Sequence, residues 1–203
     1  MTVGDAPTHA RRLDLEVDAE ALAIEVARLP DDAWLPHFNR RLYDGDWSGV
    51  ALRTIGGLPG SLYPDPNASG AWADAAVLAQ MPQVAATLDR IASPLLSARL
   101  LRLGPGASVD GHTDLDLSYD DGELRLHFPI TTGPGACFLV DGERIEMAAG
   151  ECWYVDLTRV HAVRNDGPGP RIHLVVDCSV DPWMSDALGF RPPRGLDPVR
   201  ARR

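Results

Sequence analysis

Short runs of apolar or alternating residues recur through the second half of the chain, and turn residues separate them. The runs span residues 98–103, 123–131, 136–140, 144–147, 151–157, 161–164 and 171–176. Glycine, proline and aspartate fill the gaps, and Asp141-Gly142 between two apolar runs is the strongest hairpin signal. Many short strands with such breaks predict a sandwich or barrel, and a jelly roll fits their number. We therefore expect a mainly β fold.

The first hundred residues follow a different pattern. Asp18 is placed to cap a helix that runs to about Leu29, residues 71–80 resemble a second helix, and Pro82 suits the first position of a third. Residues 31–69 carry aromatic residues among many Gly, Pro and Asp residues. We expect this irregular, aromatic-rich stretch to line a pocket rather than to act as a linker.

The length of 203 residues favours one domain. We expect residues 1–97 to form a helical and irregular part that packs on the barrel, 98–180 to form the β core, and 181–203 to form a C-terminal tail. Three cysteines, an odd number embedded in strand-like runs, indicate buried reduced thiols rather than a disulfide framework or a zinc site. The polar N-terminus and the lack of a membrane-length apolar run predict a cytoplasmic protein.

Composition excludes several functions. The net charge is −10, so neither a nucleic acid nor an anionic membrane is expected as a partner. All basic residues are arginine, and the absence of lysine excludes Schiff-base chemistry and a phosphate-loop lysine. The oligomeric state stays open.

The most informative motif is His112-Thr113-Asp114, followed by His161 and, ten residues later, Arg171. Residues i and i+2 of a strand point to one face, so His112 and Asp114 can hold one ion. Two imidazoles and a carboxylate are the ligand set of mononuclear non-haem Fe(II) oxygenases. The planar fork of an arginine suits a dicarboxylate cosubstrate. The motif therefore predicts an iron site beside a carboxylate site.

About eighty residues, 98–177, resemble the aspartyl/asparaginyl β-hydroxylase family of 2-oxoglutarate-dependent Fe(II) dioxygenases. The matching pieces, in the family's order, are Pro105-Gly106, Arg125-Leu126-His127 with Pro129-Ile130, Gly150-Glu151-Cys152-Trp153-Tyr154, His161 and Arg171-Ile172-His173-Leu174. The resemblance implies a double-stranded β-helix of the jelly-roll or cupin type, with N-terminal helices. It also implies iron on His112, Asp114 and His161, and 2-oxoglutarate on Arg171 with help from Arg125 and His127.

Asp114 sets this chain apart within the family. The animal members lack the acidic ligand, so the chain is more similar to the bacterial branch that contains the free-proline cis-4-hydroxylase. It differs from that branch because it stops soon after the barrel. A carboxylate at this position also argues against halogenation, in which a chloride occupies that place on the metal.

Several of these residues also have structural interpretations. Arg125 and His127 share a strand face and can contact the cosubstrate or the substrate, and His127 can equally be a satisfied core histidine. His173 shares a face with Arg171, and packing explains it as well as function does. Asp116 is expected to be solvated, or to lie beside a metal ligand without touching the metal, rather than to be the ligand.

The resemblance implies a hydroxylase that uses Fe(II), 2-oxoglutarate and O2 on an unactivated C–H bond. The expected substrate is an amino acid or a derivative of one, free or linked to a carrier or peptide. Trp47 and Arg53 lie where relatives build the substrate pocket, although packing or surface roles would also explain them. A non-redox metal-dependent cupin, an isomerase or hydrolase, is the main alternative, and it would have no need of Arg171. A non-catalytic metal or 2-oxoglutarate sensor is a more remote one.

Overall fold

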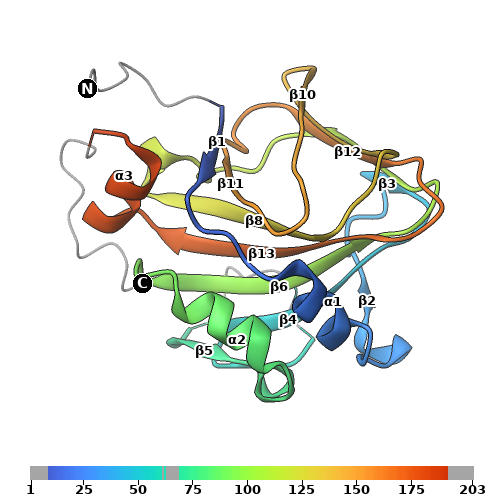
Figure 1. Cartoon of the computed structure of the whole chain (residues 1–203), viewed down its shortest axis with the longest axis horizontal. Coiled ribbons are helices and arrows are strands. Elements are labelled where there is room, and N and C mark those ends of the chain that lie inside the picture. The colour runs from blue at the N-terminus through green and yellow to red at the C-terminus, as the bar shows by residue number, and fades with distance from the viewer. Residues whose placement is uncertain (1–8, 61, 63–68, 192–203) are drawn as a thin grey trace.

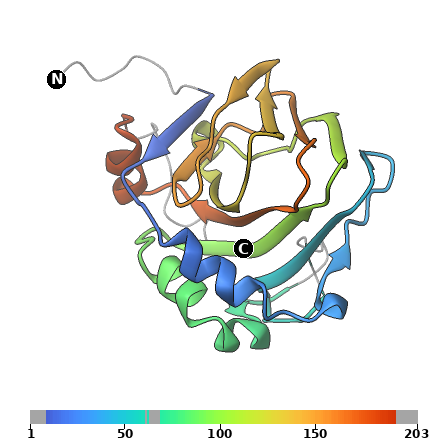
Figure 2. The same ribbon diagram turned by 45° about the vertical axis from the view of Figure 1, so that its right-hand side comes forward.

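The protein was analysed as a computed structural model, which describes residues 9–60, 62 and 69–191. Two antiparallel sheets face each other and curve into a barrel (Figure 1, Figure 2). The larger sheet has the order β1-β11-β8-β13-β6-β4-β2, with β5 paired to β4, and the smaller sheet has the order β10-β9-β12-β7-β3. The expected mainly β, double-stranded β-helix architecture is confirmed.

The larger sheet is built mainly from long strands, and the smaller one from short strands. The larger sheet contains β1 (Ala10–Leu13), β2 (Leu35–Pro36), β4 (Trp47–Ile55), β5 (Trp72–Asp74), β6 (Leu95–Leu103), β8 (Glu123–Thr131), β11 (Cys152–Val155) and β13 (Arg171–Ser179). The smaller sheet contains β3 (Tyr43–Asp44), β7 (Ser108–His112), β9 (Ala136–Val140), β10 (Glu143–Ile145) and β12 (His161–Asn165). The Asp141-Gly142 hairpin is confirmed, because Val140 of β9 pairs with Glu143 of β10.

Strand alternation divides the larger sheet into an apolar outer face and a more polar inner face. In β8 and β13 the even-numbered residues from Leu124 to Ile130 and from Ile172 to Cys178 belong to the core cluster that includes the helices. The odd-numbered residues point the other way, toward the smaller sheet. Arginine and histidine side chains on these two strands therefore enter the barrel rather than the helix-covered core.

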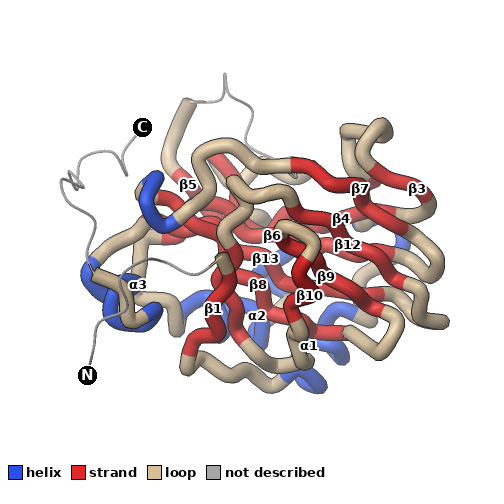
Figure 3. The backbone as a smooth tube through the Cα atoms, turned by 90° about the horizontal axis from the view of Figure 1, so that it is seen from above, coloured by secondary structure: helices blue, strands red, loops and turns tan. Residues whose placement is uncertain are grey.

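Helices cover the outer face of the larger sheet (Figure 2, Figure 3). They are α1 (Ala19–Val26), α2 (Pro82–Asp89) and α3 (Pro182–Leu188), with 3-10 turns at Asp31–Ala33, Ala76–Gln80 and Tyr119–Asp121. Asp18 caps α1 by accepting from the N–H of Ala21, and Pro82 opens α2, as expected. The buried Glu25 of α1 accepts from the N–H groups of Gln83 and Val84 at the start of α2, so one side chain joins the two helices.

Two expectations for the N-terminal part are wrong. Residues 71–80 form not a helix but β5 and a 3-10 turn, because Trp72–Asp74 pairs with the edge of β4. Residues 47–55, expected within an irregular stretch, form the nine-residue strand β4. Gly49 in that strand marks close packing rather than a loop, since a Cβ there would lie 2.7 Å from the carbonyl oxygen of Leu100.

The segment expected to be a C-terminal tail begins with helix α3. Asp181 caps this helix by accepting from the N–H of Met184, and Gly189 ends it in the left-handed conformation, with a φ of 66°. Met184 and Leu188 are buried in the outer core. Residues 192–203, the rest of the expected tail, lie outside the described residues, as do residues 61 and 63–68 of the expected aromatic-rich stretch.

The three cysteines are unpaired, with Cys152 and Cys178 buried and Cys137 partly buried. Within the described part of the chain, no helix combines the length and apolar character needed to cross a membrane.

Candidate metal and cosubstrate site

The three candidate metal ligands converge at one end of the smaller sheet. His112 is the last residue of β7 and His161 the first of β12, and the two stand directly opposite each other in the antiparallel pair. Asp114 follows two residues after β7, where its N–H donates to the carbonyl of Leu157 at 2.8 Å. One ligand atom from each of the three side chains can be chosen so that all lie within 4.8 Å of one another. The fold therefore brings His161 next to His112 and Asp114, which are distant from it in the sequence.

Backbone carbonyls orient both imidazoles. Nδ1 of His112 lies 2.8 Å from the carbonyl oxygen of Asp110, and Nδ1 of His161 lies 3.1 Å from that of Arg159. A carbonyl only accepts, so each Nδ1 carries the proton and each Nε2 keeps its lone pair. This is the tautomer that a metal-binding histidine needs. Burial is the main reason that the pKa of His161 lies below its usual value, which also favours the neutral ring.

The carboxylate of Asp114 has two different environments. Its Oδ2 accepts from Nη1 of Arg125 at 2.6 Å, while Oδ1 lies 3.9 Å from Nε2 of His112. Burial alone would raise the pKa of Asp114, but Arg125 and the two histidines lower it overall. Asp114 is therefore ionised at neutral pH, with one oxygen turned toward the imidazoles. Asp116 is exposed, has a φ of 57°, and is not part of this group.

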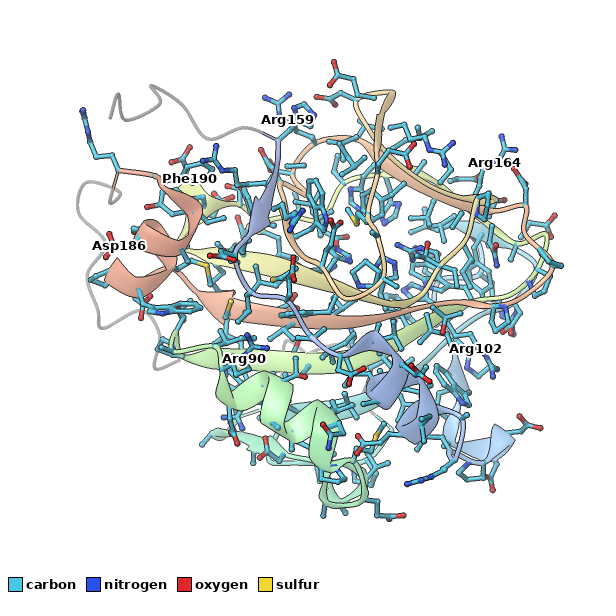
Figure 4. All side chains as sticks on the ribbon, in the orientation of Figure 1. Arg90, Arg102, Arg159, Arg164, Asp186 and Phe190 are labelled. Atoms are coloured by element: carbon cyan, nitrogen blue, oxygen red, sulfur yellow. The ribbon has the colours of Figure 1, made fainter. Side chains whose placement is uncertain are left out.

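Arg171, on the inner face of β13, is a buried cation with no carboxylate partner among the described residues. Its guanidinium donates to Nδ1 of His173 at 3.2 Å and lies over the ring of Phe138. No carboxylate of the described residues forms an ion pair with it, and burial lowers its pKa to about 9. Arg159 and Arg164, at the periphery in Figure 4, instead pair with Asp141 and Asp166.

His127, on β8, lies beside this cation and is also unsatisfied. Both of its ring nitrogens are buried and neither has a hydrogen-bond partner among the described residues. Its ring is 5.8 Å from that of His173 and 5.4 Å from that of Phe138. Burial, reinforced by Arg125 and Arg171, holds its pKa well below the usual value. The interpretation of His127 as a core histidine whose ring nitrogens are hydrogen-bonded is therefore not supported.

A cavity of about 430 Å³ reaches the buried side chains of Arg171 and His173. The rest of the cavity wall is formed by residues 132–134, 136–138, 144–148 and 151. The candidate metal ligands are not among its lining residues. Phe138 connects the two places, because its ring is parallel to that of His161 at 6.2 Å and also lies beneath Arg171.

The two candidate substrate residues differ in their surroundings. Trp47 stacks on His37, with ring centroids 3.6 Å apart, and its ring lies 6.5 Å from that of His112. Arg53 instead bonds with Asp74 at the sheet edge and with two backbone carbonyls. The N–H groups of its guanidinium therefore donate hydrogen bonds at the β4–β5 edge, and the structure offers no support for a substrate-binding role.

Sequence reasoning did not identify four residues of the site. They are His37, Arg99, Phe138 and Asp177. A sequence signal existed for Asp177, because strand alternation places it on the inward face of β13 with Arg171 and His173, six and four residues earlier. No comparable pattern marks His37, which reaches the site through its stacking on Trp47.

The family model for aspartyl/asparaginyl β-hydroxylase matches residues 16–180. The chain belongs to this family. The match begins well before the stretch that carried the resemblance, so it includes the N-terminal helices and β4. Family membership makes the protein an oxygenase of the hydroxylase type, which confirms the predicted class of enzyme.

Solved structures of the same fold include an epimerase and a prolyl hydroxylase. The α-ketoglutarate-dependent epimerase SnoN of nogalamycin biosynthesis is 16% identical, with a TM-score of 0.52 over 94% of this chain and 87% of that protein. A prolyl-4-hydroxylase of Pseudomonas putida is 15% identical, with a TM-score of 0.50 over 85% of this chain and 94% of that protein. At these identities the likeness establishes the fold alone.

Proposed function

We propose that this hydroxylase holds Fe(II) on His112, Asp114 and His161 and binds 2-oxoglutarate at Arg171. We propose further that it hydroxylates an unactivated C–H bond of an amino acid or an amino-acid-derived compound. The single observation that carries the cosubstrate assignment is the buried guanidinium of Arg171, which has no counter-charge in the part of the chain that the structure describes. A buried cation is costly unless it is paired. A bound carboxylate would supply the missing partner.

The donor set fits iron. Each imidazole offers an Nε2 lone pair, and Asp114 offers an ionised oxygen, which together make a two-histidine, one-carboxylate set with open positions. When bound, the metal and 2-oxoglutarate supply the oxidising chemistry, with O2 as oxidant. The residues of the chain orient these groups and exclude water.

The inner face of the larger sheet fits the cosubstrate. Arg171 can pair with a distal carboxylate in a bidentate way, and the unsatisfied nitrogens of His127 can bond to the same ligand. Phe138 and Val175 supply apolar surface to the interior. Arg125 has a different position from the one expected, because its guanidinium already bonds with Asp114 and Asp177. We therefore propose that Arg125 holds the metal ligand Asp114 and does not bind 2-oxoglutarate.

Trp47 is the candidate wall of the substrate site. It lies on the β4 side of His112 and stacks against His37, which Tyr43 contacts edge-on. Such an aromatic group beside the metal would contact the carbon skeleton of a small substrate.

The test is a substrate screen of the anaerobically assembled Fe(II)/2-oxoglutarate complex, exposed to O2. The readout is succinate release above the uncoupled background, matched to a hydroxylated product by mass. Free amino acids, N-acylated amino acids and short peptides form the three arms. We expect one arm to couple succinate to product in the wild type and not in His161→Ala. Metal-dependent isomerisation or hydrolysis without 2-oxoglutarate consumption would favour the non-redox cupin instead.

A further inference from the structure

A chain of alternating charges runs from the candidate metal ligand into the barrel. Asp114 accepts from Nη1 of Arg125 at 2.6 Å, and Nε of Arg125 donates to Oδ1 of Asp177 at 2.6 Å. Nη2 of Arg125 donates to Oδ2 of Asp177 at 3.1 Å, which makes this second pair bidentate. Arg99 also donates to Oδ2 of Asp177, at 3.1 Å, and so does the hydroxyl of Ser97, at 2.8 Å.

Strand register brings these groups together. Asp177 of β13 stands directly opposite Arg125 of β8, and Arg99 of β6 stands opposite Val175. Directly opposed and diagonal residues on one sheet face are within reach of one another. Asp177 and Arg125 are 7% and 8% exposed, and Arg99 is 1% exposed. The three charges are thus held on rigid central strands and away from water, where each interaction is stronger than at the surface.

We propose that Asp177 is a positioning residue of the metal centre, acting on the ligand Asp114 through Arg125. This inference rests on the proposed role of Asp114 as a metal ligand. The bidentate pair fixes the plane of the Arg125 guanidinium, so that its Nη1 holds Oδ2 of Asp114 and leaves Oδ1 to face the imidazoles. Hydrogen-bonded partners of this kind set the orientation and basicity of a ligating carboxylate.

Charge gives Asp177 a second effect. Beside Arg125 and Arg99, its carboxylate offsets positive charge that would otherwise act on the metal position. Replacing it with a neutral amide adds one net positive charge to the buried network. The added charge would act on both a bound divalent cation and the carboxylate of Asp114, because the charged side chains of the network are shielded from water. The change would weaken cation binding and hold Asp114 more tightly to Arg125.

The test is Asp177→Asn, an isosteric change, in the metal-free protein. Co(II) and Mn(II) affinities are measured by competition with a chelating dye, without 2-oxoglutarate or turnover. We expect about a 10- to 100-fold loss of affinity, the range seen when a partner of a metal ligand is removed. Ser97→Ala is the matched control, since it removes a neutral bond to the same carboxylate, and it should change affinity less than threefold, about 0.6 kcal/mol.

A double-mutant cycle separates positioning from a merely structural role. If Asp177 acts mainly through Arg125, the loss of metal affinity caused by Asp177→Asn should be clearly smaller in an Arg125→Gln background, where only its direct charge effect remains. That double variant also loses one charge of each sign, which keeps the measurement available if the single variant folds poorly. An equal loss in both backgrounds, or a lower melting temperature with unchanged metal affinity, overturns the proposal.

The wild type and His161→Ala distinguish this proposal from the function on which it rests. If His161→Ala binds Co(II) as well as the wild type, the metal assignment itself is wrong. If His161→Ala loses binding while Asp177→Asn keeps it, the metal site stands and the role of Asp177 fails.

Discussion

Arg171 donates to the Nδ1 atom of His173 at 3.2 Å, so a buried guanidinium has a neutral imidazole as its partner. Burial holds the pKa of His173 well below the usual value, and Arg171 lowers it further. The pair therefore leaves the positive charge of Arg171 without compensation. A barrel interior with this property is preorganised for an anion, since the ligand removes a cost that the folded protein already bears.

Replacing Arg171 tests this arrangement. Arg171→Leu should strongly raise the 2-oxoglutarate concentration needed for succinate formation while Co(II) binding stays nearly intact, because the candidate metal ligands belong to β7, β12 and the segment after β7 rather than to β13. Loss of a buried bidentate contact is expected to cost roughly 2–5 kcal/mol. Titration of 2-oxoglutarate into the metal-loaded protein measures this cost directly.

The surface residue Arg164, which pairs with the exposed Asp166, provides the control. Arg164→Leu removes the same charge from the chain and should leave 2-oxoglutarate affinity unchanged. An unchanged affinity in Arg171→Leu would mean that another basic residue holds the distal carboxylate. Arg125 would then be the first candidate, and its bonds with Asp114 and Asp177 would have to rearrange.

Asp114 and Asp116 have the same side chain two residues apart, which makes them a matched pair. Asp114→Ala should sharply reduce metal affinity and turnover, because the ionised ligand oxygen is lost. Asp116→Ala should be mild, since this residue is exposed and outside the ligand group. Metal content and succinate formation, measured side by side, decide the question. An inactive Asp116 variant beside an active Asp114 variant would mean that Asp116, two residues further on, is the carboxylate ligand.

Much of this site was predictable because strand alternation is a strong rule. The i, i+2 spacing placed Arg125 with His127 and Arg171 with His173, and both pairs do share the inner face of the barrel. The hairpin at Asp141-Gly142 and the cap at Asp18 follow from local turn and helix chemistry, which needs no tertiary information. Such features depend only on neighbours in the chain.

The failures of sequence reasoning concern choices that the tertiary structure makes. Residues 71–80 have helical composition, but pairing of Trp72–Asp74 with an open strand edge outweighs that local preference. Arg53 carries the right charge for a substrate carboxylate, yet Asp74 arrives beside it only because β5 joins β4. The link from Asp114 to Asp177 joins residues 63 positions apart, so no local pattern could reveal it.

The cap of helix α3 gives a prediction about stability. Asp181 accepts from the N–H of Met184 at 2.9 Å and from the hydroxyl of Ser93 at 2.6 Å. Asp181→Ala should lower the free energy of unfolding by about 0.5–2 kcal/mol, the usual cost of losing an N-cap. Urea unfolding measures the change. Asp181→Asn retains a capping oxygen and should lose less, and equal losses would indicate that charge rather than capping matters.

His37 makes the stability of the metal-free protein depend on pH. The side chain is buried against Trp47, and its Nδ1 accepts from the N–H of Asn39, which requires the neutral ring. Burial, followed by the charge of Arg99, lowers its pKa from 6.5 to about 4. Between these two values the unfolded chain takes up a proton that the folded protein does not, so stability falls as the pH is lowered from 6.5 toward 4.

The free energy of unfolding should therefore drop by about 1.6 kcal/mol between pH 6.5 and pH 5 on account of His37, because the full slope of about 1.36 kcal/mol per pH unit is reached only below the pKa of the unfolded histidine. His127 and His173 act in the same direction, because burial lowers their pKa values too. His37→Gln cannot take up the proton and should show a correspondingly smaller drop in urea unfolding experiments. If the variant and the wild type lose the same stability over this range, His37 is protonated in the folded protein, and the neutral ring stacked on Trp47 is the wrong description of this part of the site.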